Sequence, residues 1–287
     1  MPDSLSESEW TILVERIKAR KCTPFLGAGA SFGFLPLGAE IARNWAQEYN
    51  FPLDDASNLI AVAQYVALIT DPMFPKDKIV KMIEANDKFP DFDDGSEPHG
   101  ILADLPIPIF VTTNYDDFMV RALRQRHKDA RQELCRWNAY VRETSSVFDN
   151  GFVPTVANPV VFHLHGYSPM YESLVLTEDD YLDFLVNISR DEKLIPPLIQ
   201  KALMGTSLLF IGYRIADWNF RVLFRSLARF METGVRRTHF AVITPPSTAH
   251  ALKQKARDYL SKYYENIDVR VYWGTAREFA QDLRKRL

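Results

Sequence analysis

The chain alternates between short runs of consecutive apolar residues and longer segments in which apolar residues recur every three or four positions. A short apolar run bounded by turn residues is typical of a buried strand, and the longer spacing is typical of an amphipathic helix. Strands that alternate with helices favour an α/β fold, in which an open parallel sheet carries helices on both faces. The expected strands lie at 23–26, 107–111, 160–164, 207–211, 239–243 and 268–272, and the helical patterns between and after them at 116–126, 180–203, 220–231, 248–263 and 276–287.

The first hundred residues add further helices to this core. Ser6 and Glu9 have the spacing of a capping box, and apolar residues with helical spacing follow from Trp10 to Ile17, which predicts a helix that ends near Arg20. We expect one domain over residues 1–287, with a helical insertion at about 37–98. Its helical patterns lie at 39–49, 58–69 and 76–86, before an acidic, turn-rich loop at 89–98.

Composition and charge exclude several classes of protein. Of the 287 residues, 47% are hydrophobic and 25% are charged, and the formal net charge of −3 gives no basis for nucleic-acid binding. The two cysteines, Cys22 and Cys135, are too few for a zinc knuckle, so we expect no bound metal. No apolar run approaches the roughly 18 residues of a membrane span, and the first residues lack the pattern of a signal peptide. We therefore expect a cytoplasmic protein.

Polar residues follow the expected strands at the points where ligands of parallel sheets bind, outside the carboxyl ends of the strands. The first strand leads into Gly27, Ala28, Gly29, Ala30 and Ser31, a run whose backbone N–H groups suit a phosphate. The sequence therefore predicts one crevice where several strand ends meet. The other polar groups are Thr112 to Asp116 after the second strand, His165 and Gly166 after the third, and Gly212 after the fourth, with Asp217 to Asn219 opening the next helix.

A dehydrogenase is the obvious competing interpretation of the glycine run. Its fingerprint needs Gly-x-Gly-x-x-Gly and an acidic residue about 20 positions later, at the end of the next strand. Here the glycines are Gly27, Gly29 and Gly33, which is one residue too long, and the region about 20 positions later has a helical pattern. The spacing therefore disfavours hydride transfer.

Each candidate also has a purely structural interpretation. Asn114 and Asp116 are suited to cap a helix, and for Asp217 capping is the favoured interpretation. His163 and His165 alternate along one strand and share a face. His165 is the better candidate because it alone precedes a glycine, and His163 is interpreted as a hydrogen-bonded structural histidine.

The separated motifs together resemble the sirtuin-like family. The matching segments are Gly27 to Ser31, Thr112 to Asp116, His163 to Gly166, Gly205 to Ser207 and Phe210 to Asn219, and they follow one another in the family's order over roughly residues 20–230. The chain most resembles the bacterial branch (silent information regulator-like) found in anti-phage defence systems. The resemblance implies a Rossmann-like sheet that binds NAD+ and cleavage of the nicotinamide–ribose bond.

Departures from the deacylase pattern indicate the activity within this family. Deacylases carry four zinc cysteines, and this chain has two cysteines in total. Deacylases also continue the first motif with Asp-Phe-Arg, which residues 32–38 lack, and Thr113 stands where a glutamine is usual. The resemblance therefore implies hydrolysis of NAD+ to ADP-ribose and nicotinamide, with NAD+ as substrate and no cofactor or zinc. A non-catalytic module that senses NAD+ or ADP-ribose, and an NAD-dependent deacylase, are the alternatives.

The resemblance assigns roles to individual residues. Asn114 is expected to position a water or the ribose hydroxyls, and His165 to act as general base. Asp116 is expected to orient its neighbours or lie near the nicotinamide. The remaining expected NAD-binding residues are Gly27, Ala28, Gly29 and Ser31 at the pyrophosphate, Ser207 and Gly212 on the adenosine side, and Thr113 and Asp217.

The resemblance also implies partners. Members of this branch form homo-oligomers and act with sensor domains or ATPases. The matching motifs take up most of this chain, so we expect regulation by self-assembly or by a separate protein such as a HerA-type hexameric ATPase. The helix at 7–20 and the segment 37–98 are the expected contact surfaces.

Overall fold

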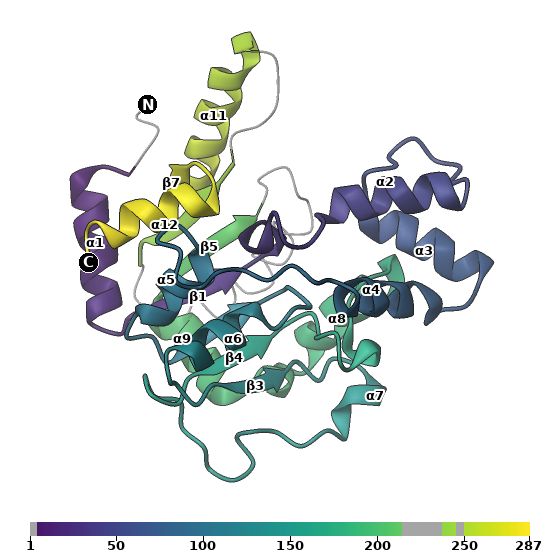
Figure 1. Cartoon of the computed structure of the whole chain (residues 1–287), viewed down its shortest axis with the longest axis horizontal. Coiled ribbons are helices and arrows are strands. Elements are labelled where there is room, and N and C mark those ends of the chain that lie inside the picture. The colour runs from purple at the N-terminus through teal and green to yellow at the C-terminus, as the bar shows by residue number, and fades with distance from the viewer. Residues whose placement is uncertain (1–4, 214–236, 245–249) are drawn as a thin grey trace.

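The computed structural model describes residues 5–213, 237–244 and 250–287, and for 250–254 it describes the backbone alone. Its centre is a seven-stranded, all-parallel sheet in the order β3-β4-β2-β1-β5-β6-β7 (Figure 1). The predicted α/β fold with a parallel, Rossmann-like sheet is confirmed. The strands are β1 (Cys22–Leu26), β2 (Ile109–Thr112), β3 (Arg131–Leu134), β4 (Val160–His163), β5 (Ser207–Tyr213), β6 (His239–Ile243) and β7 (Val269–Trp273).

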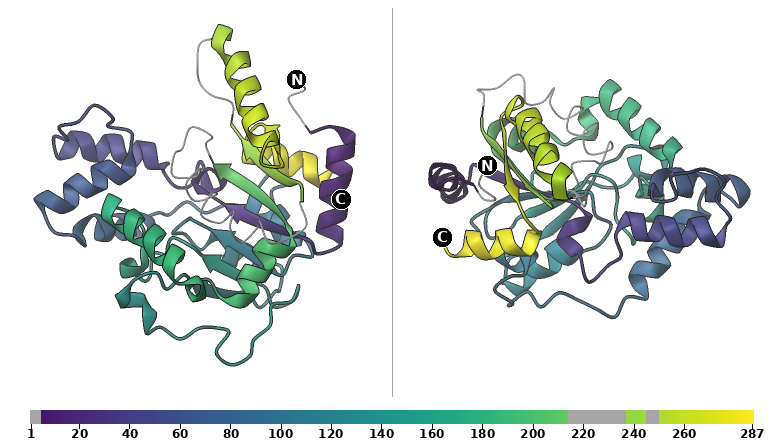
Figure 2. Two further views of the ribbon diagram at one scale, coloured as in Figure 1. Left: turned by 180° about the vertical axis from the view of Figure 1, so that it is seen from behind. Right: turned by 90° about the horizontal axis from the view of Figure 1, so that it is seen from above.

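Helices cover both faces of the sheet because neighbouring strand residues point in opposite directions. Leu26 packs into one hydrophobic cluster and Phe25 into another on the opposite face. The first cluster takes in α1 (Glu7–Lys18), α5 (Pro98–Asp104), α6 (Phe118–Gln125) and α12 (Ala276–Arg284). The second takes in α8 (Glu178–Arg190), α9 (Pro197–Gly205) and Tyr264 of α11 (His250–Glu265), and the two layers are seen in Figure 2.

A group of three helices lies beside the sheet and has a hydrophobic cluster of its own. It consists of α2 (Gly38–Glu48), α3 (Leu59–Ile69) and α4 (Phe74–Glu84), which we call the helical module (Figure 1). A buried ion pair at 2.7 Å between Lys76 and Asp180, at the start of α8, ties it to the rest of the fold. The module falls within the segment predicted as a helical insertion, whose boundaries stay a prediction.

Local patterns did not predict α5 or the short helix α7 (Ala139–Arg142), and they misjudged two further elements. The helix expected over 180–203 is divided into α8 and α9, with the short 3₁₀ turn η3 (Glu192–Leu194) between them. Pro196 and Pro197 explain the break, because proline cannot continue a helix but suits the first turn of a new one. Strand β3 was not expected at all. Its sequence is polar because it lies at the edge of the sheet, where only one neighbour pairs with it.

Other expected helices are found close to their predicted bounds, including α1 with its Ser6–Glu9 capping box. The turns η1 (Ala28–Ser31) and η2 (Tyr171–Ser173) complete the described elements. The helix expected at 220–231 lies outside the described residues. In the part of the chain that is described, no helix combines the length and the apolar character that crossing a bilayer requires.

Candidate functional site

The sheet order brings four of the expected strand ends side by side. Strands β4, β2, β1 and β5 are consecutive neighbours, so the segments that follow them share one edge of the sheet. The next strand in the chain, β2, pairs with one side of β1, and β5, which forms much later in the chain, pairs with the other side. This reversal next to β1 is the position at which open α/β sheets bind ligands.

The glycine run after β1 packs directly on β5. The N–H of Gly27 donates to the carbonyl of Ile211 at 2.9 Å, and η1 follows at once. A Cβ added to Gly29 would lie 2.9 Å from the Cα of Gly212. Gly212 has a φ of 85°, and a Cβ there would overlap the backbone of Ala30. These glycines are therefore needed for a close approach of two backbones, whatever ligand the run also binds.

Three buried polar side chains form a hydrogen-bonded cluster next to this run, which we call the Asn114 cluster (Asn114, Ser31 and Asp116). The Nδ2 of Asn114 donates to the carbonyl of Gly27 at 3.2 Å and to Ser31 Oγ at 3.3 Å. Ser31 Oγ in turn donates to Asp116 Oδ2 at 2.9 Å. The side chains come from η1 and from the loop after β2, so they meet only because β1 and β2 are paired.

The hydrogen bonds of the Asn114 cluster show which of its side chains caps helix α6. Asp116 Oδ1 accepts the N–H of Phe118 at 3.1 Å, so Asp116 stabilises the start of α6 with one oxygen and holds Ser31 with the other. Asn114 caps nothing, because its side chain is directed to the β1 side. Burial raises the pKa of Asp116, while a charge on His99 and the bonds from Phe118 and Ser31 act in the opposite direction.

Thr113 and Tyr213 complete this edge of the sheet. The Tyr213 hydroxyl donates to the carbonyl of Leu26 at 2.9 Å and lies 2.9 Å from Thr113 Oγ1. A Cβ on Gly27 would lie 2.8 Å from the Tyr213 ring, which therefore covers the end of β1. Tyr213 was not among the expected site residues, although its place directly after Gly212 at a strand end is a signal for it.

The two histidines at the end of β4, His163 and His165, have different surroundings. His165 packs edge-on against Phe184 of α8, with ring centroids 4.9 Å apart, and its buried Nε2 has no hydrogen-bond partner in the described structure. Burial lowers its pKa to about 3, so the ring is neutral at physiological pH. His163 lies in β4 with its Nε2 3.3 Å from Gln132 Nε2, and burial lowers its pKa to about 4.

The structure brings most, but not all, of the expected site residues together. Ser207 is the first residue of β5 and pairs with Cys22 at the start of β1. It therefore lies at the amino ends of the strands, whereas Gly212 lies at their carboxyl ends. Five residues of extended strand place the two about 16 Å apart. Ser207 precedes its apolar run instead of following it, which is why the geometry separates it from the Asn114 cluster. Asp217 lies outside the described residues.

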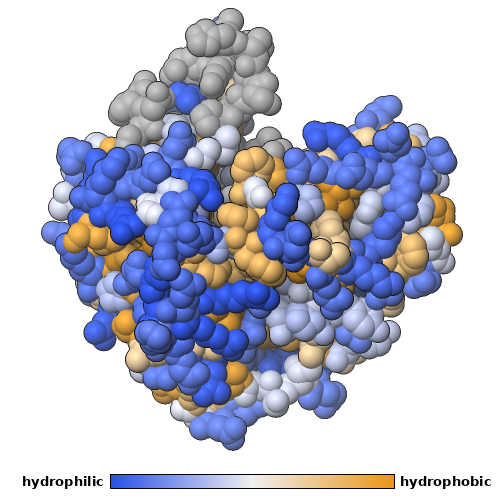
Figure 3. Space-filling model, viewed as in Figure 1, coloured by the Kyte–Doolittle hydropathy of each residue, from blue (hydrophilic) through white to orange (hydrophobic). Residues whose placement is uncertain are grey.

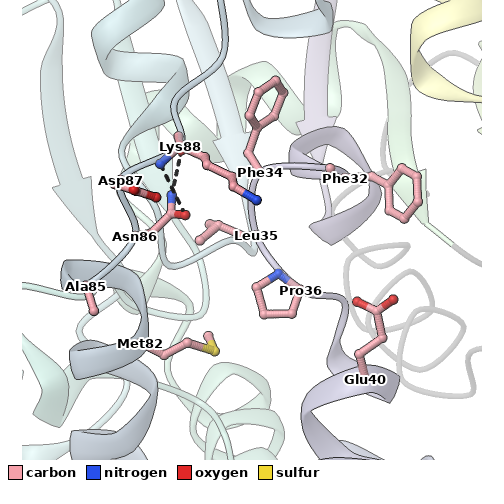
Figure 4. A pocket seen from close by; sticks show the side chains of 11 residues that line it. Phe32, Phe34, Leu35, Pro36, Glu40, Met82, Ala85, Asn86, Asp87 and Lys88 are labelled. Carbon is pink, nitrogen blue, oxygen red and sulfur yellow. Dashed lines mark hydrogen bonds between the residues drawn. The ribbon is translucent and has the colours of Figure 1, made fainter.

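An open groove of about 500 Å³ lies next to the glycine run. Residues 32–36, which directly follow Ser31, form one wall, and residues 82–88 at the end of α4 form the other (Figure 4). Phe34, Leu35 and Met82 supply apolar surface. The charged residues of the lining are Glu40, Asp87 and Lys88. Figure 3 shows hydrophobic surface on the same side of the molecule, between the sheet and the helical module.

Within the described ranges, neither the cysteines nor the acidic side chains form a recognisable metal site. Cys22 and Cys135 are both free and buried, and burial raises the pKa of the Cys22 thiol to about 12. Among the described residues, no three side chains of histidine, cysteine, aspartate or glutamate are grouped so as to hold a metal ion.

Comparison with known proteins gives two findings. Residues 108–269, more than half of the chain, match the SIR2-like domain. Curated relatives named "NAD(+) hydrolase ThsA" are 27% identical over 221 residues in Bacillus cereus (strain MSX-D12) and 23% identical over 251 residues in Acinetobacter baumannii (strain 532279). These matches cover 76% and 82% of this chain and 42% and 46% of the relatives, so the chain spans less than half of their length. By the match to the SIR2-like domain, the chain belongs to that family.

Proposed function

We propose that the chain hydrolyses NAD+ at the nicotinamide–ribose bond and releases nicotinamide and ADP-ribose. The observation that carries the proposal is the Asn114 cluster, buried at the carboxyl edge of the sheet beside the glycine run. The family and the names of the relatives support the same chemistry.

The proposed mechanism uses Asn114 to orient the nucleophile. Its Nδ2 is occupied by Gly27 and Ser31, so its Oδ1 is the atom left to accept a hydrogen bond from a water or a ribose hydroxyl. Cleavage builds positive charge on the ribose, and nicotinamide leaves as a neutral molecule with the electron pair of the broken bond. No general acid is needed for this departure.

His165 is the proposed base. Burial keeps its imidazole neutral, so a ring nitrogen has a lone pair that can accept the proton of the attacking water. A pKa of about 3 makes the ring only weakly basic in this structure, so the role requires that bound substrate change its surroundings and raise that pKa. In this structure its ring contacts Tyr181 and Phe184 of α8, so substrate must bring the reacting water to it. The backbone of Gly27 to Ser31 binds the pyrophosphate in this proposal.

The test is turnover by the purified chain and two variants. Asn114→Ala and His165→Ala are each expected to lower nicotinamide release by roughly 10²- to 10⁴-fold, measured by chromatography of nicotinamide and ADP-ribose. Asn266→Ala, on the exposed segment after α11, is the matched control and should turn over like the unaltered chain. Normal turnover by either folded site variant would contradict its assigned role. Binding of NAD+ without release by the unaltered chain would favour a sensing module, and acyl transfer from an acetyl-peptide would favour a deacylase.

We further propose that this activity depletes NAD+ in anti-phage defence in the cytoplasm, in a homo-oligomer or with a HerA-type ATPase. Exposed apolar side chains in the helical module and its connections support a contact surface there, since Leu53 is 67% and Leu68 is 74% exposed. The mass of the protein, alone and with a co-encoded ATPase, tests this proposal alongside NAD+ turnover. A monomer that is fully active alone would contradict it.

A further inference from the structure

Helix α8 contacts His165 with one face and the helical module with its first turn. Tyr181 and Phe184 meet the His165 ring edge-on, with ring centroids 5.9 and 4.9 Å away. The two residues directly before Tyr181, Asp179 and Asp180, are bound by side chains of the module. Both sets of contacts lie within the first two turns of one helix, so a shift of its first turn is passed to the residues on His165.

Lys76 of α4 holds this turn through a buried ion pair. Its Nζ lies 2.7 Å from Asp180 Oδ1, and the lysine and aspartate side chains are 6% and 13% exposed. Asp180 Oδ2 accepts the N–H groups of Leu176 and Thr177, so the same carboxylate also caps α8. A buried carboxylate that loses its cation is costly, and movement of the turn toward water relieves that cost.

Gln64 of α3 makes a second contact with the same turn. Its Nε2 donates to Asp179 Oδ2 at 2.8 Å, and its Oε1 accepts the N–H of Asp179 at 3.0 Å. This N–H belongs to the first turn, whose N–H groups have no partner inside the helix. Gln64 therefore satisfies the end of α8 and fixes its place against the module.

The remaining contacts of α8 allow it to shift as a unit. The helix ends at Arg190, and η3 and Pro196 separate it from α9. Leu182 and Val186 are 59% and 41% exposed, so outward movement of α8 displaces little packing on that side. Phe184 packs on the sheet with or without the module, and the contacts of the module supply the additional restraint.

The position of α8 bears directly on the proposed base. The Nε2 of His165 is buried and has no hydrogen-bond partner in the described structure. A base must come within hydrogen-bond reach of the proton that it accepts. Turnover by the proposed mechanism therefore requires Tyr181 and Phe184 to move from the His165 ring.

We propose that Gln64 and Lys76 are positioning residues, which hold the first turn of α8 and so keep the His165 ring covered until bound substrate moves the helix. The inference rests on the proposed NAD+ hydrolysis and adds a restraint on its base. Neither residue touches the substrate, and their effect passes through Asp179 and Asp180. Because both belong to the helical module, a partner that displaces the module releases α8 in this scheme.

Two variants release α8 in different ways. Lys76→Met keeps an unbranched side chain but leaves Asp180 without its cation. Gln64→Glu replaces the donor amide with a carboxylate that repels Asp179. The second change lies at the surface, so it should leave the chain folded even if the first does not.

Each variant has a matched control. Lys78, also in α4, pairs with Glu48 of α2 at 2.6 Å, so its ion pair lies inside the module. Gln125 Nε2 donates to Asp93 Oδ2 at 2.8 Å, at the same distance as in the Gln64 contact but away from α8. Lys78→Met and Gln125→Glu therefore remove the same kinds of interaction without altering α8.

The first experiment needs no NAD+. Diethyl pyrocarbonate acylates neutral imidazole nitrogens that solvent reaches, and mass spectrometry of peptide fragments gives a rate for each histidine. His165 is neutral at physiological pH, so its rate reports access to the ring. We expect roughly 5- to 10-fold faster modification of His165 in Lys76→Met and Gln64→Glu, with exposed His127 unchanged. Both control variants should match the unaltered chain.

An unchanged His165 rate contradicts the role of the residue that was altered. If Lys76→Met does not fold, Gln64→Glu decides the outcome alone. An equal rise in Gln125→Glu would also overturn the inference, because it would show that any added surface carboxylate has the same effect.

The second experiment is steady-state turnover. The kcat/KM for NAD+ should rise roughly 3- to 10-fold in Lys76→Met and Gln64→Glu, because less of the binding free energy of the substrate goes into moving α8. Lys78→Met and Gln125→Glu should turn over like the unaltered chain. Merely structural damage would lower turnover, so a fall in kcat/KM in folded Gln64→Glu contradicts the restraint.

These outcomes separate the inference from the function on which it rests. An unaltered chain that releases no nicotinamide contradicts NAD+ hydrolysis, while the modification of His165 still tests the hold on α8. An active chain whose Lys76→Met and Gln64→Glu variants keep normal His165 modification and normal kcat/KM contradicts the restraint alone.

Discussion

The ends of β1 and β2 differ sharply from the end of β4, although all three carry candidate site residues. At the ends of β1 and β2, the side chains of Asn114, Ser31 and Asp116 are joined by hydrogen bonds to one another and to the backbone. At the end of β4, His165 has aromatic neighbours and a ring nitrogen without a hydrogen-bond partner in the described structure. Hydrogen bonds thus fix the side chains at the ends of β1 and β2, while apolar packing keeps the His165 ring neutral.

Acidification should have the largest effect, because it lowers the stability of a fold that buries neutral histidines. Burial lowers the pKa of His163 and of His239 to about 4, from an ordinary value of 6.5. Below that ordinary value the unfolded chain binds protons that the folded histidines do not, so stability falls as the pH falls from 6.5 toward 4. At about pH 5 each histidine should cost on the order of 2 kcal/mol.

The measurement is urea unfolding at neutral pH and at about pH 5. His163→Asn should remove about 2 kcal/mol of the pH dependence, while His127→Asn at the surface should leave it unchanged. Asp116 acts with the opposite sign, because its raised pKa lets the folded chain hold a proton that the unfolded chain has lost. Equal stability at the two pH values would contradict the neutral, buried state of the histidines.

After the two histidines, which together account for about 4 kcal/mol, the next largest effect should come from Gly212→Ala. Gly212 and Gly33 have similar φ values of 85° and 92°, so alanine is strained at both. Only at Gly212 would the new Cβ also overlap η1, whereas at Gly33 nothing lies within 4 Å. We expect a loss of about 3 kcal/mol at Gly212 and about 1 kcal/mol at Gly33, measured by chemical unfolding. Equal losses would show that η1 does not depend on close packing against β5.

Ser31→Ala should have a smaller effect on stability. It removes the hydroxyl between Asp116 and Asn114 and leaves a buried carboxylate oxygen without its donor. The expected loss is about 1 to 2 kcal/mol, together with weaker NAD+ binding in calorimetry. Ser189→Ala, on the exposed face of α8, is the control. Unchanged binding and stability would indicate that the Asn114 cluster does not need its central member.

Tyr213→Phe should give the smallest change. The variant keeps the ring over Gly27 but loses the hydroxyl that bonds Leu26 and Thr113. About 1 kcal/mol of stability should be lost, because Thr113 retains its own 3.3 Å bond to the Leu26 carbonyl. Thermal unfolding provides the measurement. A loss of stability as large as that of Gly212→Ala would mean that the Tyr213 hydroxyl stabilises the ends of β1 and β2 by more than its hydrogen bonds to Leu26 and Thr113 explain.

Much of the site followed from the sequence because it lies at strand ends. Gly27 to Ser31, Asn114, His165 and Gly212 each come directly after an apolar run, and parallel strands place such residues at one edge of the sheet. Ser207 was misjudged for the same reason, since it begins its strand. Tyr213 was missed because its contacts with β1 and β2 depend on strand order.

By itself, the sequence determined the α/β class, most of the strands and the residues that end them, because burial imposes a short-range period on apolar positions. Only the tertiary structure decided which strand ends are neighbours and that β3, in which Leu134 is the one apolar residue, pairs at an edge of the sheet. It alone placed Ser31 against Asp116 and η1 against Gly212. These contacts join residues that are far apart in the chain, and no local spacing records the strand pairing that brings them together.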